Sequence, residues 1–236
     1  MVTIQSSART GLTDGHGRRI SYLRLSVTDR CDLRCRYCMA EDMRFLPRSA
    51  VLSVEELGDL AERFVARGVR RIRLTGGGPL VRPGIDRVAR RLGAMLGSGL
   101  DELTLTTNGM RLADEAAMLA DAGVRRINVS LDTLDPASFT HITRVGDLQV
   151  ALGGIAAARR AGLAVKINMV ALAGLNEDQL VPMLAWCADN GCDLTIIETM
   201  PLGEVAEDRA DHYIPLHAFI EPLRAERAIW PIAKAT

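Results

Sequence analysis

The chain has 236 residues and is electrically balanced, with 29 Lys+Arg and 29 Asp+Glu. It therefore carries no overall field that would attract nucleic acid or an anionic membrane, and no apolar run approaches the ~20 residues that a membrane span requires. The length suits one large α/β domain. Five cysteines and a polar N-terminus without an export signal predict a reducing, cytoplasmic location.

Apolar strand-like runs alternate with helical patterns along the chain. The predicted strands are Ile20–Val27, Arg70–Thr75, Glu102–Thr107, Arg125–Leu131, Ala164–Ala171 and Asp193–Glu198. The predicted helices are Ser53–Arg67, Gly84–Leu96, Arg111–Asp121, Leu148–Ala161 and Asn176–Asn190. Such alternation is typical of βα units around a parallel sheet. We predict an α/β fold, a partial six-stranded parallel (β/α)6 TIM-like barrel, with a doubly wound open sheet as the alternative.

Every second residue in most of these strands is polar. Successive strand side chains point to opposite faces, so this parity predicts a polar inner face within an apolar wall. A barrel built only for stability would fill its interior with Val, Ile and Leu. We therefore expect a binding chamber. Its predicted lining is Arg24, Ser26, Thr28, Arg71, Arg73, Thr75, Thr104, Thr106, Asn108, Asn128, Ser130, Lys166 and Asn168.

Three cysteines follow the first predicted strand at the spacing C-x-x-x-C-x-x-C: Cys31, Cys35 and Cys38. Three thiolates can hold a [4Fe–4S] cluster and leave one iron free, and such a cluster with S-adenosylmethionine (SAM) is a source of radical chemistry. A zinc site would need a fourth ligand, which this segment lacks. Zinc or no metal remain the alternatives. Cys187 and Cys192 are interpreted as packed thiols.

The other unusual segments also follow predicted strands, where β/α barrels place their active sites. These segments are Thr75–Pro79, Thr106–Gly109, Ser130–Asp132 and Glu198–Pro201.

Among the cations inside predicted strands are Arg24, Arg73 and Lys166. Burying an unpaired cation is costly, so each needs a carboxylate or an anionic ligand. Two interpretations stay open, namely pairing with acids such as Glu198 or Asp132, and binding of a phosphate-bearing substrate.

Several stretches together resemble the GTP 3′,8-cyclase family (molybdenum cofactor biosynthesis protein A) of the radical SAM superfamily. They are Leu23–Cys31, Arg73–Gly77, Leu105–Gly109, Asn128–Thr133, Ile142–Arg144, Val165–Asn168 and Ile197–Gly203. The resemblance implies an N-terminal extension over 1–16 and a radical SAM core barrel over 17–204. Residues 205–236 would then begin a truncated C-terminal region that lacks a second iron–sulfur cluster.

The resemblance implies a lyase of molybdenum cofactor biosynthesis that uses a [4Fe–4S] cluster and SAM. A 5′-deoxyadenosyl radical would take hydrogen from the ribose C3′ of GTP, and this carbon would attack C8 of guanine to give (8S)-3′,8-cyclo-7,8-dihydroguanosine 5′-triphosphate. The catalytic metal ligands would be Cys31, Cys35 and Cys38. Contacts to SAM are implied for Tyr37, Gly77, Ser130 and Met200. Contacts to GTP are implied for Arg24, Arg73, Thr106 and Lys166.

An electron donor is also implied, and the product would pass to pyranopterin monophosphate synthase. Neither nucleic acid nor a membrane is expected as a partner. A homodimer is left open.

The chain departs from the family pattern at three places. Gly78 stands where the family has the acid of Gly-Gly-Glu-Pro, and Thr195 stands where the family usually has arginine. Losing a charge-assisted hydrogen bond to SAM costs about 1.5–3 kcal/mol, or roughly 10- to 150-fold in affinity. The sequence also ends at Thr236, before the family's second cysteine cluster. The alternatives are an impaired cyclase, a single-cluster radical SAM enzyme with another substrate, and a non-catalytic paralogue that binds a cluster or nucleotide.

Overall fold

Six parallel strands form one sheet in the computed structural model, which describes residues 11–200 and 209–225. The strands are β1 (Tyr22–Ser26), β2 (Arg71–Thr75), β3 (Glu102–Thr107), β4 (Arg126–Ser130), β5 (Ala164–Ala171) and β6 (Asp193–Glu198). Each strand pairs with the next in chain order. A doubly wound sheet would reverse its strand order part of the way across, so the partial-barrel prediction is confirmed and the alternative is wrong.

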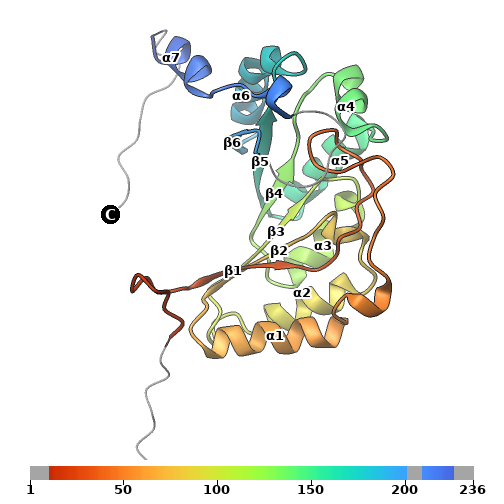
Figure 1. Ribbon diagram of the computed structural model, residues 1–236. Helices are drawn as coiled ribbons and strands as arrows, with labels where there is room; N and C mark the ends of the chain where they lie inside the picture. The colour runs from red at the N-terminus through yellow and green to blue at the C-terminus, as the bar shows by residue number, and fades with distance from the viewer. Residues whose placement is uncertain (1–10, 201–208, 226–236) are drawn as a thin grey trace, which may run out of the picture.

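Helices cover one side of the curved sheet (Figure 1). They are α1 (Val54–Ala66), α2 (Ile85–Gly93), α3 (Leu112–Asp121), α4 (Pro136–Thr143), α5 (Leu148–Arg160) and α6 (Leu180–Asp189). Helix α7 (His217–Ala225) lies apart from this layer (Figure 1). Short 3-10 turns occur at Arg48–Ala50, Pro79–Val81, Glu177–Gln179 and Arg209–His212. No helix in the described ranges is both long enough and apolar enough to cross a bilayer.

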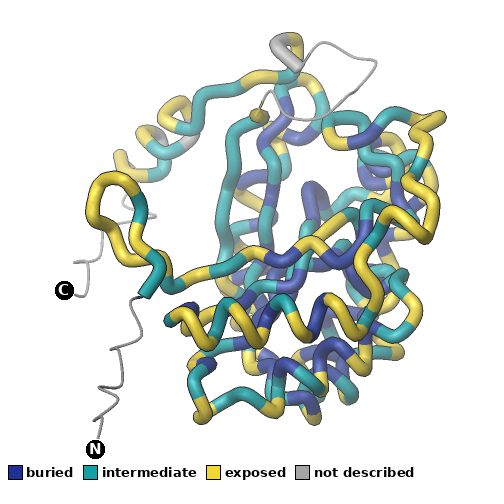
Figure 2. The backbone as a smooth tube through the Cα atoms, turned by 60° about the horizontal axis from the view of Figure 1, so that its bottom comes forward, coloured by how far each residue is buried: buried dark blue, intermediate teal, exposed yellow. Residues whose placement is uncertain are grey.

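Helix α1 illustrates how local sequence sets these elements. The Ser53 side chain accepts from the Glu56 amide while the Glu56 carboxylate accepts from the Ser53 amide, which makes a capping box. The helix then buries Leu57 and Ala61 against the sheet side of the core. Figure 2 shows that buried residues are concentrated in the interior, between the helices and the sheet.

Helix α4 was missed by sequence reasoning. It begins with Pro136, a residue favoured in the first turn, and the Asp135 carboxylate accepts the Ser138 amide. The helix is short and contains β-branched residues, which have low helix propensity. Its hydrophobic pattern alone is therefore too weak to predict a helix.

The two faces of the sheet differ as predicted. Helix-facing residues such as Leu74, Leu105 and Ile167 are fully buried, whereas opposite-facing residues such as Arg24 and Lys166 are not. We call the latter side the inner face. Its carboxyl end also carries a pair of apolar residues that the parity argument did not include, since Val170 pairs with Ile197.

Candidate active site

The three cysteines lie in the segment that follows β1, at the carboxyl end of the sheet. Cys31 and Cys35 are half-buried and Cys38 is exposed, and all three are free thiols. Residues 27–53, which include them, form the cysteine loop. The loop therefore occupies the end of the barrel at which β/α enzymes place their chemistry.

Helix α4 anchors the cysteine loop. The amides of Arg34 and Arg36 donate to the carbonyls of Thr143 and Ile142 at 3.1 and 3.0 Å. Arg144 then adopts a left-handed φ of 67°, and its guanidinium donates to the Arg34 carbonyl at 3.3 Å. A non-glycine residue with positive φ is uncommon and costs energy. The helix that the sequence did not reveal thus supports the predicted metal-binding segment.

The glycine-rich turn after β2 packs directly against the backbone of the cysteine loop. The amide of Gly77 donates to the Thr28 carbonyl at 2.9 Å. A Cβ on Gly77 would lie 2.5 Å from the Arg30 carbonyl oxygen, and a Cβ on Gly76 would lie 2.2 Å from that of Thr28. These glycines are therefore required for the close approach of the two loops. A contact between Gly77 and SAM stays a prediction.

The Cys31 sulfur already has two hydrogen-bond donors. The Leu33 amide lies 3.4 Å and the Asn108 side-chain nitrogen 3.6 Å from Sγ. Burial, with nearby Asp132 and the other two thiols, raises the pKa of the Cys35 thiol well above its usual value. A coordinated metal deprotonates such a thiol outright, and hydrogen bonds to sulfur help to set cluster potentials.

No three His, Cys, Asp or Glu side chains in the described ranges converge on a point that one metal ion could occupy. A cubane does not need that convergence, because each thiolate binds a different iron. The donor set of three free thiols on one loop therefore fits a [4Fe–4S] cluster.

Tyr37 connects the loop to β4 and β5. Its hydroxyl donates to Asp132 Oδ2 at 2.8 Å, and Asp132 Oδ1 accepts the Val170 amide at 2.9 Å. Burial raises the pKa of Asp132 to about 6, although both hydrogen bonds favour its charged form. The Tyr37 hydroxyl is thus engaged with the protein, and its predicted contact with SAM stays a prediction.

Asn176 hydrogen-bonds to the backbone of the same region. Its side chain donates to the carbonyls of Asp132 and Val170 at 2.7 and 2.9 Å and accepts the Leu172 amide at 2.8 Å. Asn176 is fully buried. The sequence carried no signal for this role, because the three backbone groups come together only when β4 and β5 pair.

Asp32 lies between the cysteine loop and β3. Its Oδ1 accepts Asn108 Nδ2 at 2.6 Å, and its Oδ2 lies 3.5 Å from Arg111 Nε. A Cβ on Gly78 would be 3.3 Å from Asp32 Oδ1 and 3.5 Å from Cys31 Sγ. Position 78 and Asp32 therefore face the same place beside the first cysteine. Sequence reasoning had not selected Asp32 as a site residue.

The predicted GTP-binding cations lie on the inner face. Arg24 and Arg73 are register partners on β1 and β2, while Lys166 lies across β4 and β5 from Asn128. Arg73 Nε is 3.4 Å from the Thr104 hydroxyl, and its guanidinium stacks over the ring of Tyr22 at 5.6 Å. Neither Arg24 nor Lys166 has a hydrogen bond or an ion pair with any described residue.

The acids that could have neutralised these cations are engaged elsewhere. Asp132 binds Tyr37 and an amide, as described above, and Glu198 accepts the Leu216 amide at 2.9 Å. Among the described residues, pairing of the cations with Glu198 or Asp132 is therefore wrong. The Thr106 hydroxyl and Asn128 Oδ1 are also buried without a hydrogen-bond partner there. A polar ligand on the inner face would satisfy these groups.

The remaining predicted SAM contacts lie at the ends of two strands. Ser130 is half-buried at the end of β4, and Met200 is 55% exposed just beyond β6. Thr195 lies on the inner face as the register partner of Asn168. The rest of the motif that contains Met200, residues 201–203, lies outside the described residues.

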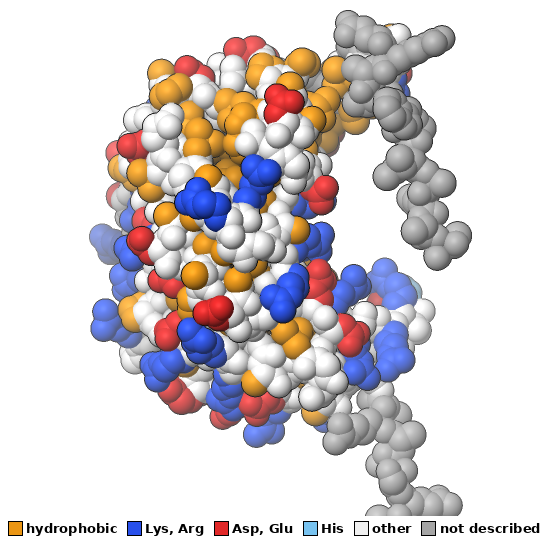
Figure 3. All heavy atoms as spheres, turned by 180° about the vertical axis from the view of Figure 1, so that it is seen from behind, with side chains coloured by type: hydrophobic (Ala, Val, Ile, Leu, Met, Phe, Trp, Pro, Cys, Tyr) orange, Lys and Arg blue, Asp and Glu red, His pale blue; other side chains and the backbone are white. Residues whose placement is uncertain are grey.

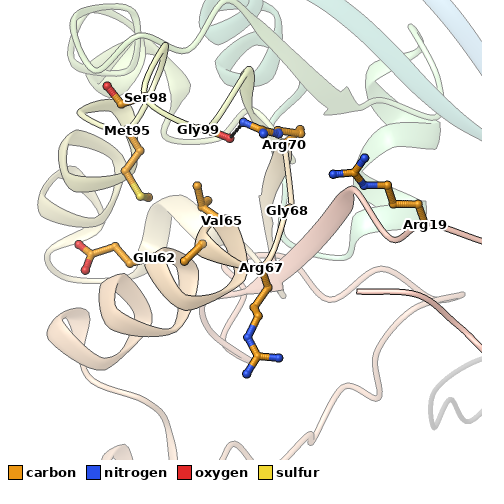
Figure 4. Close-up of a pocket in the computed structure, with 10 residues that line it drawn as sticks. Arg19, Glu62, Val65, Arg67, Gly68, Arg70, Met95, Ser98 and Gly99 are labelled. Atoms are coloured by element: carbon orange, nitrogen blue, oxygen red, sulfur yellow. Dashed lines mark hydrogen bonds between the residues drawn. The ribbon is translucent and has the colours of Figure 1, made fainter. Parts of the chain in front are cut away.

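A separate pocket of about 320 Å³ lies at the opposite end of the strands (Figure 4). Arg70 points along its rim and donates to the Gly99 carbonyl at 2.9 Å, whereas Arg67 points away. The rear surface mixes basic and acidic side chains without a single-sign patch (Figure 3). Neither feature adds a residue to the site around the cysteines.

Comparison with known proteins agrees with this geometry. The model of the radical SAM superfamily matches residues 25–187. The fold is similar to that of SuiB from Streptococcus suis, in a crystal structure with bound S-adenosylmethionine, with a TM-score of 0.71, 18% identity and coverage of 89% of this chain and 47% of that one. Methylornithine synthase (PylB) gives a TM-score of 0.68 at 15% identity, with coverage of 87% and 61%.

Curated relatives are much closer in sequence. GTP 3′,8-cyclase of Erythrobacter litoralis is 58% identical over 218 residues, which are 92% of this chain and 66% of that protein. GTP 3′,8-cyclase of Rhodopseudomonas palustris is 54% identical over 236 residues, which are 100% of this chain and 69% of that protein. The chain thus spans about two thirds of the length of these relatives. On these matches, the chain belongs to the GTP 3′,8-cyclase family of the radical SAM superfamily.

Proposed function

We propose that this chain forms the cluster-, SAM- and GTP-binding core of a GTP 3′,8-cyclase, a lyase of molybdenum cofactor biosynthesis. The carrying observation is that three cysteines of one loop, none in a disulfide, lie at the carboxyl end of an inner face. This face bears cations that have no anionic partner among the described residues. Family membership supports the same assignment. Impaired activity, and division of the chain at residues 17 and 205, remain parts of the proposal.

The superfamily implies a [4Fe–4S] cluster and SAM as cofactors. Together they supply one-electron, hydrogen-abstracting chemistry when bound. Cys31, Cys35 and Cys38 would hold the cluster, and the Leu33 amide would donate to the first of these sulfurs. Tyr37 and Asp132 would keep the loop in place during this chemistry.

The inner face would bind GTP through charge. Arg24 and Lys166 have no anionic partner among the described residues, and a triphosphate would provide one. The unsatisfied Thr106 hydroxyl lies on the same face, next in register to Asn128. By binding GTP on the inner face, these groups would place its ribose near the cysteine loop, where the radical chemistry would begin.

The partners follow from the reaction. An electron donor must reduce the cluster, and the cyclised nucleotide would be consumed by pyranopterin monophosphate synthase. A cytoplasmic location is supported by five cysteines that are all free thiols, a state that a reducing compartment maintains. A homodimer remains open.

A second candidate function is a non-catalytic member that binds the cluster or a nucleotide without turnover. Gly78 favours it, since glycine supplies no carboxylate to SAM.

Anaerobic iron–sulfur reconstitution followed by reductive SAM cleavage, with and without GTP, distinguishes the two functions. We expect 5′-deoxyadenosine, and its loss in Cys38→Ala but not in the control Cys192→Ala. Lys166→Met should weaken GTP binding, whereas the exposed Arg67→Met should not. Cluster assembly without SAM cleavage would support the non-catalytic function. Failure to assemble a cluster would overturn the cyclase function and would leave nucleotide binding as the only form of the second function.

A further inference from the structure

The glycine at position 78 is not demanded by the backbone. Its φ is −119°, a value that any residue adopts. A Cβ there would meet only side-chain atoms, at 3.3 Å or more, whereas a Cβ on Gly77 would clash with carbonyl oxygens at 2.5 Å. A side chain at position 78 would therefore begin against the Asp32 carboxylate, beside Cys31.

The Asp32 carboxylate lies beside position 78. Its Oδ1 is the atom nearest to a Cβ on Gly78, and its side chain is 25% exposed. Asn108 Nδ2 and Cys31 Sγ lie 2.6 and 4.0 Å from Oδ1, and Arg111 Nε lies 3.5 Å from Oδ2. A carboxylate has about four acceptor sites, so it can accept a further cation.

No other acid is among the three atoms nearest to a Cβ at position 78. Asp132 accepts from Tyr37 and the Val170 amide. Asp29 Oδ2 accepts the Leu46 amide at 2.6 Å, and its Oδ1 is buried without a hydrogen-bond partner among the described residues. Asp29 lines a different pocket, of about 520 Å³, with Ser53 and Arg82. A buried ammonium group needs a carboxylate partner, and Asp32 is the one with free capacity at position 78.

We infer that the Asp32 carboxylate binds the ammonium group of SAM in place of an acid at position 78. This inference rests on the proposed function. It makes Asp32 a binding residue for the cofactor, with Asn108 positioning the carboxylate. It also predicts that Asp32 and an acid placed at position 78 substitute for each other.

The test is anaerobic equilibrium dialysis, which measures the affinity of the cluster-loaded chain for SAM and for 5′-methylthioadenosine. The second ligand lacks the amino-acid group of SAM. Asp32→Asn should weaken SAM binding roughly 10- to 150-fold, the cost of one charge-assisted hydrogen bond, and leave 5′-methylthioadenosine unchanged. Asp32→Glu should retain SAM binding, and Gly78→Glu should restore it in Asp32→Asn. Iron content establishes that each variant holds the cluster.

Several results would overturn the inference. Wild-type affinity for SAM in Asp32→Asn would do so, as would equal weakening for both ligands, because Asp32 would then act on the site as a whole. If Asp32→Asn fails to retain iron, the SAM affinity of the single variant Gly78→Glu tests the inference instead. With Asp32 in place the added carboxylate faces a like charge, so tightening of SAM binding by tenfold or more would contradict the inference. Absence of SAM binding in the cluster-loaded wild type would instead overturn the proposed function.

Discussion

Replacing Tyr37 by Phe tests the link between the cysteine loop and the barrel. The variant removes only the hydroxyl that donates to Asp132 Oδ2 at 2.8 Å. Asp132 is 5% exposed, so water cannot replace the lost donor. An unsatisfied charged acceptor costs about 1.5–3 kcal/mol of unfolding free energy. We expect that loss near pH 8, where Asp132 is ionised.

The pH dependence follows from Asp132. Burial raises its folded pKa from 3.8 to about 6, which corresponds to about 3 kcal/mol of opposition to folding when the group is ionised. Stability from this group is therefore fully present below its unfolded pKa and lost as pH rises through about 6. Losing the Tyr37 hydrogen bond raises the pKa of Asp132 further. The cost of Tyr37→Phe should accordingly be smaller near pH 5 than near pH 8.

The assay is urea unfolding of the chain before iron is added, followed by circular dichroism at both pH values. Tyr213→Phe is the matched control, because the Tyr213 hydroxyl is 3.4 Å from Glu198 and the residue is 50% exposed. The control should change stability by less than about 0.5 kcal/mol. Equal costs for the two variants, or a cost of Tyr37→Phe that does not vary with pH, would refute the reasoning.

Two further variants probe the same framework. Asn176→Ala should lower the free energy of unfolding in urea by roughly 3 kcal/mol or more, because three buried backbone groups lose their partner. The control Asn190→Ala, at a partly buried position, should lower it by about 1 kcal/mol. Similar values for both variants would contradict the role of Asn176. Gly77→Ala should lower the iron retained after reconstitution, because the added methyl forces the loops apart at a cost of about 1–3 kcal/mol. Its control, Gly153→Ala in α5, has open space and should stabilise the chain by roughly 0.5–1 kcal/mol. Full iron retention in Gly77→Ala would show that the loop contact is dispensable.

Features encoded by short-range pattern could be predicted from the sequence. The inner face follows from period-two alternation, so Thr106 and Lys166 were placed correctly without any tertiary information. The cysteine spacing is equally local. Helix α4 was not predicted, because its stability comes from its contacts with the cysteine loop and the core rather than from intrinsic propensity.

The contacts that hold the site together join residues that are far apart in the sequence. Asp32 meets Asn108, and Tyr37 meets Asp132, across loops separated by 76 and 95 residues. No local rule joins such positions, because they become neighbours only after the strands pair. Polar residues at strand ends were recognisable as candidates, but their partners were not.

The most direct test of the proposed function is isotope transfer from GTP labelled with deuterium at the ribose C3′. The cluster-loaded chain is incubated anaerobically with SAM, reductant and the labelled nucleotide, and 5′-deoxyadenosine is analysed by mass spectrometry. The account predicts deuterium in 5′-deoxyadenosine, and none when the label is on guanine C8 instead. Formation of 5′-deoxyadenosine that never carries the C3′ label would contradict it.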